Sequence, residues 1–133
     1  MNIEQIALDD TRIGIVENML TDIKGVTPDS YYNNERRDVP TTFYLGYGGQ
    51  TPICVIETHS EKQGELFLTN FGIDEDVQLS GYGRQFIVLF ENLAKEKGYG
   101  TIRLTSHPDS YGFYLKCGYK PHGKWEYGLL KVL

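Results

Sequence analysis

The sequence predicts an α/β (α+β) fold: a twisted, mostly antiparallel sheet of about six or seven strands, with one parallel pair and helices on both faces. Two observations predict it. Three β-rich segments follow one another across short turns, and strands joined in this way pair antiparallel. A strand–helix–strand unit comes next, and such a crossover joins parallel neighbours. The length of 133 residues fits one domain spanning 1–133.

The first part of the chain contains one strand and one amphipathic helix. Residues 1–7 can form a short strand, and Asp9 or Asp10 can cap the helix, because a side-chain oxygen there accepts a free backbone N–H. Apolar residues then recur at helical spacing at Ile13, Val16, Leu20 and Ile23. Gly25 is the expected stop. Residues 26–40 predict a loop with room for one short helix.

The middle of the chain predicts a three-stranded meander over 41–47, 51–58 and 65–73. Gly48-Gly49 is a strong hairpin signal between the first two strands. The polar residues 59–64 predict the second turn. The apolar run from Ile53 to Ile56 indicates that the middle strand is buried on both faces.

The last part predicts alternating helices and strands. Residues 82–97 carry apolar side chains on one helical face and are followed by a glycine. Residues 100–105 form a strand, and Pro108 fits the start of a helix that runs to about Cys117. Residues 119–133 form a final hairpin.

Composition argues against several classes of protein. Hydrophobic residues make up 40% and charged residues 23%, as in globular proteins. The longest apolar run, Phe86 to Phe90, is far shorter than the ~20 residues of a membrane span. Residues 1–5 do not resemble a signal peptide, so we expect a cytoplasmic protein with Cys54 and Cys117 reduced. The cysteine and histidine spacings do not suggest a metal site.

The charge is unevenly distributed. The net charge is −5; residues 1–97 carry 8 basic and 16 acidic side chains, and residues 98–133 carry 5 and 2. An acidic body with a basic tail disfavours nucleic acid as a partner. The pattern suits a cationic amine near the acidic part and an anionic ligand near the basic part. Solvated faces without a partner are the alternative.

The segment Gln78-Leu79-Ser80-Gly81-Tyr82-Gly83 joins a strand to the strongest helix. Its glycines let a ligand approach the backbone closely. The helix start directs free N–H groups and its positive dipole end at this turn, an arrangement that binds phosphate without lysine. A tight connection that binds nothing is the alternative. A dinucleotide fingerprint is absent, because Phe86 stands at the position of its third glycine.

This loop resembles the Arg/Gln-x-x-Gly-x-Gly/Ala signature of the GNAT superfamily of acyl-CoA-dependent N-acyltransferases. The family's hydrophobic residue five positions earlier corresponds to Ile73. A second family signature, a helix ending in Tyr-x-x-x-Gly-aromatic, is matched by Tyr114 to Tyr119. The resemblance covers the core region 65–121 and implies the GNAT acyl-CoA N-acyltransferase fold, in which the parallel pair is splayed.

The resemblance also implies an activity: transfer of an acetyl group from acetyl-CoA to a primary amine by direct attack. Backbone N–H groups near Ile73 would hold the thioester and pantetheine. Tyr114 would be the general acid, since a tyrosine keeps its proton at neutral pH and can donate it to a thiolate. The residues expected at the pyrophosphate are Gln78, Leu79, Ser80, Gly81, Tyr82, Gly83 and Arg84.

Two positions depart from the family pattern. Ser80 stands where the family often has a basic residue, and Arg84 follows the loop instead. His107 stands where the family often has an asparagine that contacts the pantetheine arm. His107 either replaces that asparagine or simply begins the helix at Pro108.

The general base is open. The candidates on or beside the central strands are Glu57, His59, Glu65 and Asp74. The family's glutamate aligns with Phe67, two residues from Glu65. We take Glu65 as the catalytic base, because strand alternation places it on the same face as Phe67. That alternation places Glu65, Phe67, Thr69 and Phe71 on one face. A β-bulge would change this register, and a water chain could replace the carboxylate.

The acceptor is also open. The acidic part favours a small cationic molecule or a protein amine. The tyrosines that could form the wall of its pocket, or simply pack, are Tyr31, Tyr32, Tyr44 and Tyr47. A homodimer could complete the cleft. The alternative functions are a catalytically silent acyl-CoA-binding regulator that acts through a protein partner, and a protein that modifies charged tRNA.

Overall fold

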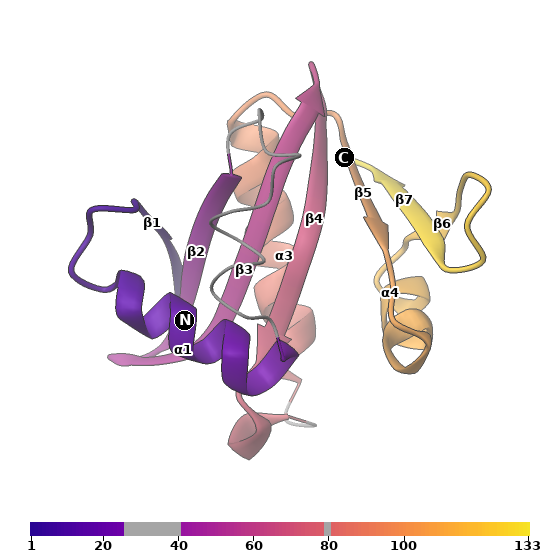
Figure 1. Ribbon diagram of the computed structural model, residues 1–133. Helices are drawn as coiled ribbons and strands as arrows, with labels where there is room; N and C mark the ends of the chain where they lie inside the picture. Colours follow the sequence, from indigo (N-terminus) through magenta and orange to yellow (C-terminus); the bar gives the residue numbers. More distant parts are fainter. Residues whose placement is uncertain (26–40, 79–80) are drawn as a thin grey trace.

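The computed structural model describes residues 1–25, 41–78 and 81–133 (Figure 1). They form a seven-stranded sheet of order β1-β2-β3-β4-β5-β7-β6. Only β4 and β5 pair in parallel; the other neighbours are antiparallel. The strands are β1 (Asn2–Ile6), β2 (Thr41–Gly48), β3 (Thr51–Lys62), β4 (Glu65–Ile73), β5 (Thr101–Thr105), β6 (Lys120–Pro121) and β7 (Gly128–Val132). The predicted mixed sheet is confirmed.

Helices cover both faces of the sheet, as predicted. The helices are α1 (Ile13–Lys24), α3 (Tyr82–Glu96) and α4 (Tyr111–Lys116), with 3-10 turns at Glu75–Val77 and Pro108–Ser110. Val16 and Leu20 of α1 pack with Val55 of β3 on one face. Phe86 and Phe90 of α3 pack with Ile56 on the other. Burial of β3 on both faces follows from this arrangement.

The start of α1 differs from the prediction, although its end does not. The Asp10 carboxylate accepts the backbone N–H of Arg12 at 2.8 Å and also binds the Arg12 guanidinium. The helix begins at Ile13, one residue after Arg12, and no side chain caps it. Arg12 is therefore the N-cap in place of the predicted Asp9 or Asp10, and the Asp10 carboxylate instead binds the N–H of Arg12 in the turn before the helix. Gly25 ends α1 in the left-handed conformation, with φ 66°.

Three further boundaries are corrected. The turn predicted over 59–64 is confined to its last two residues, because β3 continues to Lys62 and pairs there with Glu65. The helix expected from Pro108 to Cys117 is a 3-10 turn followed by the short α4. The final hairpin pairs only the two residues of β6 with β7. The loop 26–40, with Tyr31 and Tyr32, lies outside the described residues, as do Leu79 and Ser80.

A bulge in β4 changes which side chains share a face. The register passes from Glu57 opposite Asn70 to Thr58 opposite Leu68, so Thr69 has no residue opposite it. Phe67 stacks on His59 of β3, with ring centroids 4.9 Å apart, whereas Phe71 stacks on Phe113 of α4 at 6.2 Å. The prediction that Glu65, Phe67, Thr69 and Phe71 share one face is therefore wrong, because one inserted residue reverses the alternation.

The parallel pair is short. β4 and β5 pair only between Glu65–Phe67 and Thr101–Arg103. Beyond Phe67 the strands diverge, and Figure 1 shows the open angle between β4 and β5. The implied splay is present, and it places α4 and β7 on an arm separate from β1–β4.

Candidate active site

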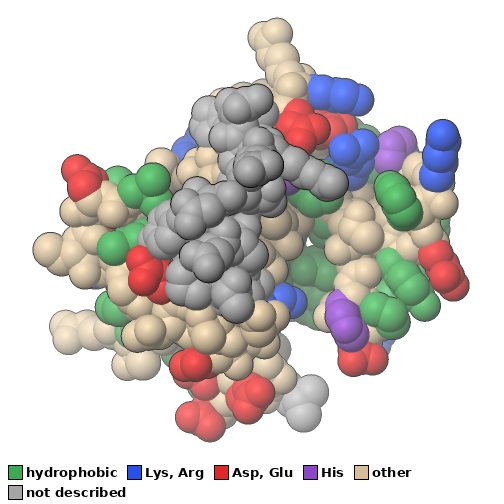
Figure 2. Space-filling model, viewed as in Figure 1, with side chains coloured by type: hydrophobic (Ala, Val, Ile, Leu, Met, Phe, Trp, Pro, Cys, Tyr) green, Lys and Arg blue, Asp and Glu red, His purple; other side chains and the backbone are tan. Residues whose placement is uncertain are grey.

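Two cavities adjoin the gap between β4 and β5. Both are lined by Lys24, Phe71, Ser110 and Tyr114. The larger, of about 240 Å³, extends to Ile73 and Gln78. The smaller, of about 40 Å³, reaches His107 beside β5. Figure 2 shows the surface hollowed between the β1–β4 body and the arm, with hydrophobic side chains inside the hollow. The splay therefore creates a site.

The backbone of Ile73 faces this gap. The Asp74 N–H donates to the Ile53 carbonyl at 2.8 Å. Ile73 and Cys54 are therefore opposite residues that exchange no hydrogen bonds, and the N–H and C=O of Ile73 point away from β3. The carbonyl accepts the Gln78 side-chain amide at 2.9 Å. The Ile73 N–H is left directed at the gap, where it can bind a carbonyl oxygen.

Tyr114 reaches the gap from α4. Its side chain is 7% exposed, and its ring packs edge-on against Tyr119 with centroids 5.6 Å apart. Burial raises the pKa of Tyr114 above its usual value of about 10, and the nearby Cys117 and Cys54 add to the shift. The hydroxyl therefore keeps its proton through neutral and mildly alkaline pH. It is a proton donor placed at both cavities.

The glycine loop ends at the start of α3. Gly81 has φ 85°, a left-handed conformation that favours glycine, and Tyr82 begins the helix. The first turn carries no acidic residue, and its N–H groups have no intrahelical acceptor. A Cβ on Gly83 would lie 3.3 Å from the Phe113 ring, so this glycine lets α3 approach α4 closely. The described part of the loop is suited to an anion.

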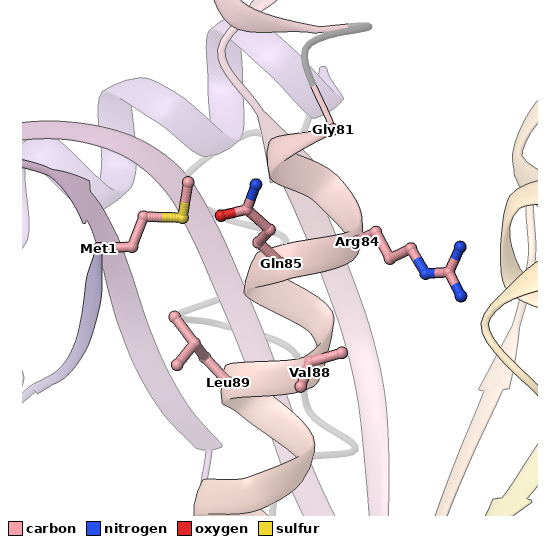
Figure 3. Close-up of a pocket in the computed structure, with 6 residues that line it drawn as sticks. All are labelled: Met1, Gly81, Arg84, Gln85, Val88 and Leu89. Carbon is pink, nitrogen blue, oxygen red and sulfur yellow. The ribbon is translucent and has the colours of Figure 1, made fainter.

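Arg84 points toward the arm. In Figure 3 its guanidinium extends away from a separate groove on the outer side of α3 and toward the side on which α4 lies. That groove, of about 550 Å³, is lined by Met1, Gly81, Arg84, Gln85, Val88 and Leu89. Tyr114 and Ile73 do not line it. This groove is therefore distinct from the gap between β4 and β5.

His107 begins the 3-10 turn. Its Nδ1 accepts the Asp109 backbone N–H at 3.4 Å, and its side chain is 68% exposed. The interpretation of His107 as the residue that starts the helix is supported by this contact. The side chain also borders the smaller cavity, so contact with a ligand there is compatible with capping.

The structure does not bring Glu65 to Tyr114. The Glu65 carboxylate lies 3.6 Å from Arg103 in the paired part of the sheet, and Arg103 covers the Phe67 ring at 5.5 Å. Glu65 lines neither cavity of the gap. It precedes Phe71 by six residues on β4, about 20 Å at ~3.3 Å per residue.

Glu57 occupies a more central position. It is 1% exposed on β3, and its Oε1 accepts the Asn70 side-chain amide at 2.9 Å. Asn70 directly precedes Phe71 on β4, but the two side chains point to opposite faces, and Glu57, like Glu65, lines neither cavity. Its position directly after the apolar run Ile53–Ile56 was the sequence signal for this residue. The sequence carried no comparable signal for Lys24.

The other candidate bases have structural contacts. The His59 Nδ1 lies 2.8 Å from the Thr69 hydroxyl, and the Asp74 carboxylate accepts the Asp76 backbone N–H.

Other residues considered for the site have structural positions. Tyr44 and Tyr47 are buried core residues, so they pack rather than form the wall of an acceptor pocket. Cys54 and Cys117 are free thiols. Within residues 1–25, 41–78 and 81–133, side chains form no cluster suited to a metal, and the helices are too short or too polar to cross a bilayer.

The comparisons with known proteins agree with this geometry. The acetyltransferase (GNAT) family model matches residues 9–119. The structure of GCN5 from Tetrahymena has a TM-score of 0.78 at 12% identity, over 99% of this chain and 96% of that one. A Bacillus subtilis acetyltransferase in complex with CoA has a TM-score of 0.74 at 17% identity, over 99% and 98%.

A third structure, the PaiA N-acetyltransferase of Thermoplasma acidophilum in complex with coenzyme A, has a TM-score of 0.72 at 16% identity over the full length of both chains. A search of curated proteins by sequence found no match. The structural similarities define a GNAT fold. Because the family model covers most of the chain, the protein belongs to the acetyltransferase (GNAT) family and is an N-acetyltransferase that uses acetyl-CoA.

Proposed function

We propose that this enzyme transfers the acetyl group of acetyl-CoA to a primary amine of a small cationic molecule or a protein, by direct attack with Tyr114 as general acid. The observation that carries the proposal is the position of Tyr114. Its buried, protonated side chain lines both cavities of the splay, beside the strand whose Ile73 N–H is directed at the gap.

The cofactor site follows from the same geometry. The pyrophosphate binds at the loop from Gln78 to Arg84, because the free N–H groups at the start of α3 favour an anion. The pantetheine arm runs along the open edge of β4 toward Ile73 and borders His107. Two proteins with the same fold were solved in complex with CoA, which supports CoA as the ligand of this fold.

The proposed reaction divides between the two sides of the gap. The Ile73 N–H donates to the thioester oxygen, which gains negative charge as the amine adds; one such donor is often worth about 3 kcal/mol. Tyr114 then gives its proton to the departing thiolate. The raised pKa of Tyr114 keeps that proton available at the pH of the reaction.

The amine must lose a proton, and two carboxylates are candidates. Glu65 is the residue predicted from the sequence. Glu57 is favoured by the geometry, because it is buried, oriented by Asn70 and adjacent to the open part of β4. A water molecule between Glu57 and the amine would complete the path. The excess of carboxylates in residues 1–97 supports a cationic acceptor.

The test compares Tyr114→Phe with Tyr111→Phe, a control on the same helix whose ring packs on Tyr127 and does not line the two cavities. Release of CoA is measured with a panel of polyamines, aminoglycosides and lysine peptides. We expect kcat to fall about 10²-fold in Tyr114→Phe, with acetyl-CoA affinity retained. Wild-type activity should persist above pH ~10, because burial raises the pKa of Tyr114.

Full turnover by Tyr114→Phe at every pH would show that another group is the acid. Binding of acetyl-CoA by calorimetry without product from any amine would favour the silent regulator that acts through a protein partner. The two failures are distinguishable, because the first affects only the role of Tyr114.

A further inference from the structure

Lys24, the last residue of α1, contributes to both cavities of the gap between β4 and β5. Its stem lies against β4 at Gly72: a Cβ built on Gly72 would be 3.2 Å from the Lys24 Cδ and 3.4 Å from its Cγ. The absence of a side chain at Gly72 therefore lets the lysine cross the strand. A lysine side chain of the protein itself thus lies beside the cleft that Tyr114 lines.

Lys24 lacks the contacts that hold other cations in this fold. Lys97 donates to Gln5 and to the Tyr44 hydroxyl, and Lys131 donates to Glu91. Within the described ranges 1–25, 41–78 and 81–133, the Lys24 amine makes no ion pair or hydrogen bond. A structural role for this ammonium therefore has no partner among those residues.

The environment of Lys24 favours its reactive form. Part of the side chain is open to solvent, yet the protein around it withdraws the ammonium from water, and this desolvation lowers the pKa of Lys24. A larger share of the side chain is then neutral at a given pH. Only the neutral amine carries the electron pair that attacks a thioester.

We propose that Lys24 is an internal acetyl acceptor, whose Nζ attacks the carbonyl carbon of acetyl-CoA bound in the gap. The inference rests on the proposed function, because it uses the same bound acetyl-CoA and Tyr114. The N–C bond forms and the C–S bond breaks. The lysine nitrogen loses a proton to water, Tyr114 protonates the CoA thiolate, and solvent returns a proton to Tyr114. The products are free CoA and one acetyllysine.

The test incubates the full chain with acetyl-CoA and without an added amine. Mass spectrometry of proteolytic peptides follows acetylation at Lys24 and at Lys95, an exposed lysine of α3 that serves as the internal standard. We expect Lys24 to react at least tenfold faster than Lys95, at a rate independent of protein concentration. Tyr114→Phe should slow Lys24 at least tenfold and leave Lys95 unchanged. Lys24→Arg should lose the modification at position 24 only.

The outcomes separate this inference from the proposed function. If acetyl-CoA binds and amines are acetylated while Lys24 reacts no faster than Lys95, Lys24 is not an acceptor and the proposed function stands. A rate at Lys24 that rises with protein concentration would overturn the internal reaction. Failure of the wild type to bind acetyl-CoA in calorimetry would overturn both.

Discussion

The two halves of β4 have different structures and different uses. The first half, Glu65–Phe67, pairs with β5, and Glu65 forms an ion pair with Arg103 of that strand. The second half, Leu68–Ile73, has left β5 and lines cavities together with Tyr114. The Thr69 bulge lies at the change between them. The comparison teaches that loss of strand pairing, rather than a special set of side chains, opens the site.

The largest effect should come from filling the space at the start of α3, next to the open second half of β4. We expect Gly83→Trp to reduce acetyl-CoA affinity at least about a hundredfold, because even a Cβ there lies 3.3 Å from Phe113 and a larger group would fill the α3–α4 approach. By the usual conversion, that factor is about 2.8 kcal/mol of binding free energy. Calorimetry measures the dissociation constant.

The matched control is Gly14→Trp on α1, where a Cβ would meet no atom within 4 Å. Its affinity for acetyl-CoA should equal that of the wild type, with circular dichroism checking the fold of both variants. Equal affinities in the two tryptophan variants would remove the loop from the proposed cofactor site.

Glu57 lies opposite the second half of β4 and Glu65 lies in its first half, so substitutions at these two glutamates compare the two halves. Glu57→Gln keeps the shape and the Oε1 that accepts from Asn70, but it removes the proton acceptor. We expect kcat to fall about 10- to 100-fold at neutral pH, whereas Glu65→Gln changes it less than about twofold. The measurement is kcat against pH for both variants. The reverse ranking would restore Glu65 as the base and reject Glu57.

The smallest effect should come from a substitution at the first half of β4, which pairs with β5. Arg103→Met removes the ion pair with Glu65 and the cation–π contact with Phe67. Because this pair is partly exposed, we expect a loss of about 1 kcal/mol or less in the free energy of unfolding, and less at high salt. Urea titration at two salt concentrations measures it. Turnover should not change; a large loss of kcat would mean that the paired half contributes to catalysis.

Most of the fold could be predicted because its signals are local. The stripe of α1, the Gly25 stop and the meander all depend on residues a few positions apart. The site motifs are equally local: Gly81 directly precedes α3 and Tyr114 lies on α4, as expected. The face predicted for the second half of β4 was wrong for a physical reason, since one bulge residue, Thr69, reverses every alternation that follows it.

The sequence by itself determined the order of the elements, the glycine turn before α3 and the tyrosine of α4, because periodicity, glycine conformation and helix starts are properties of short segments. Only the tertiary structure decided that β4 leaves β5 after Phe67, that Tyr114 lines the opened gap, and that Lys24 reaches it across Gly72. These contacts join segments far apart in the chain. They depend on how strands diverge and helices pack, which no short stretch of sequence specifies.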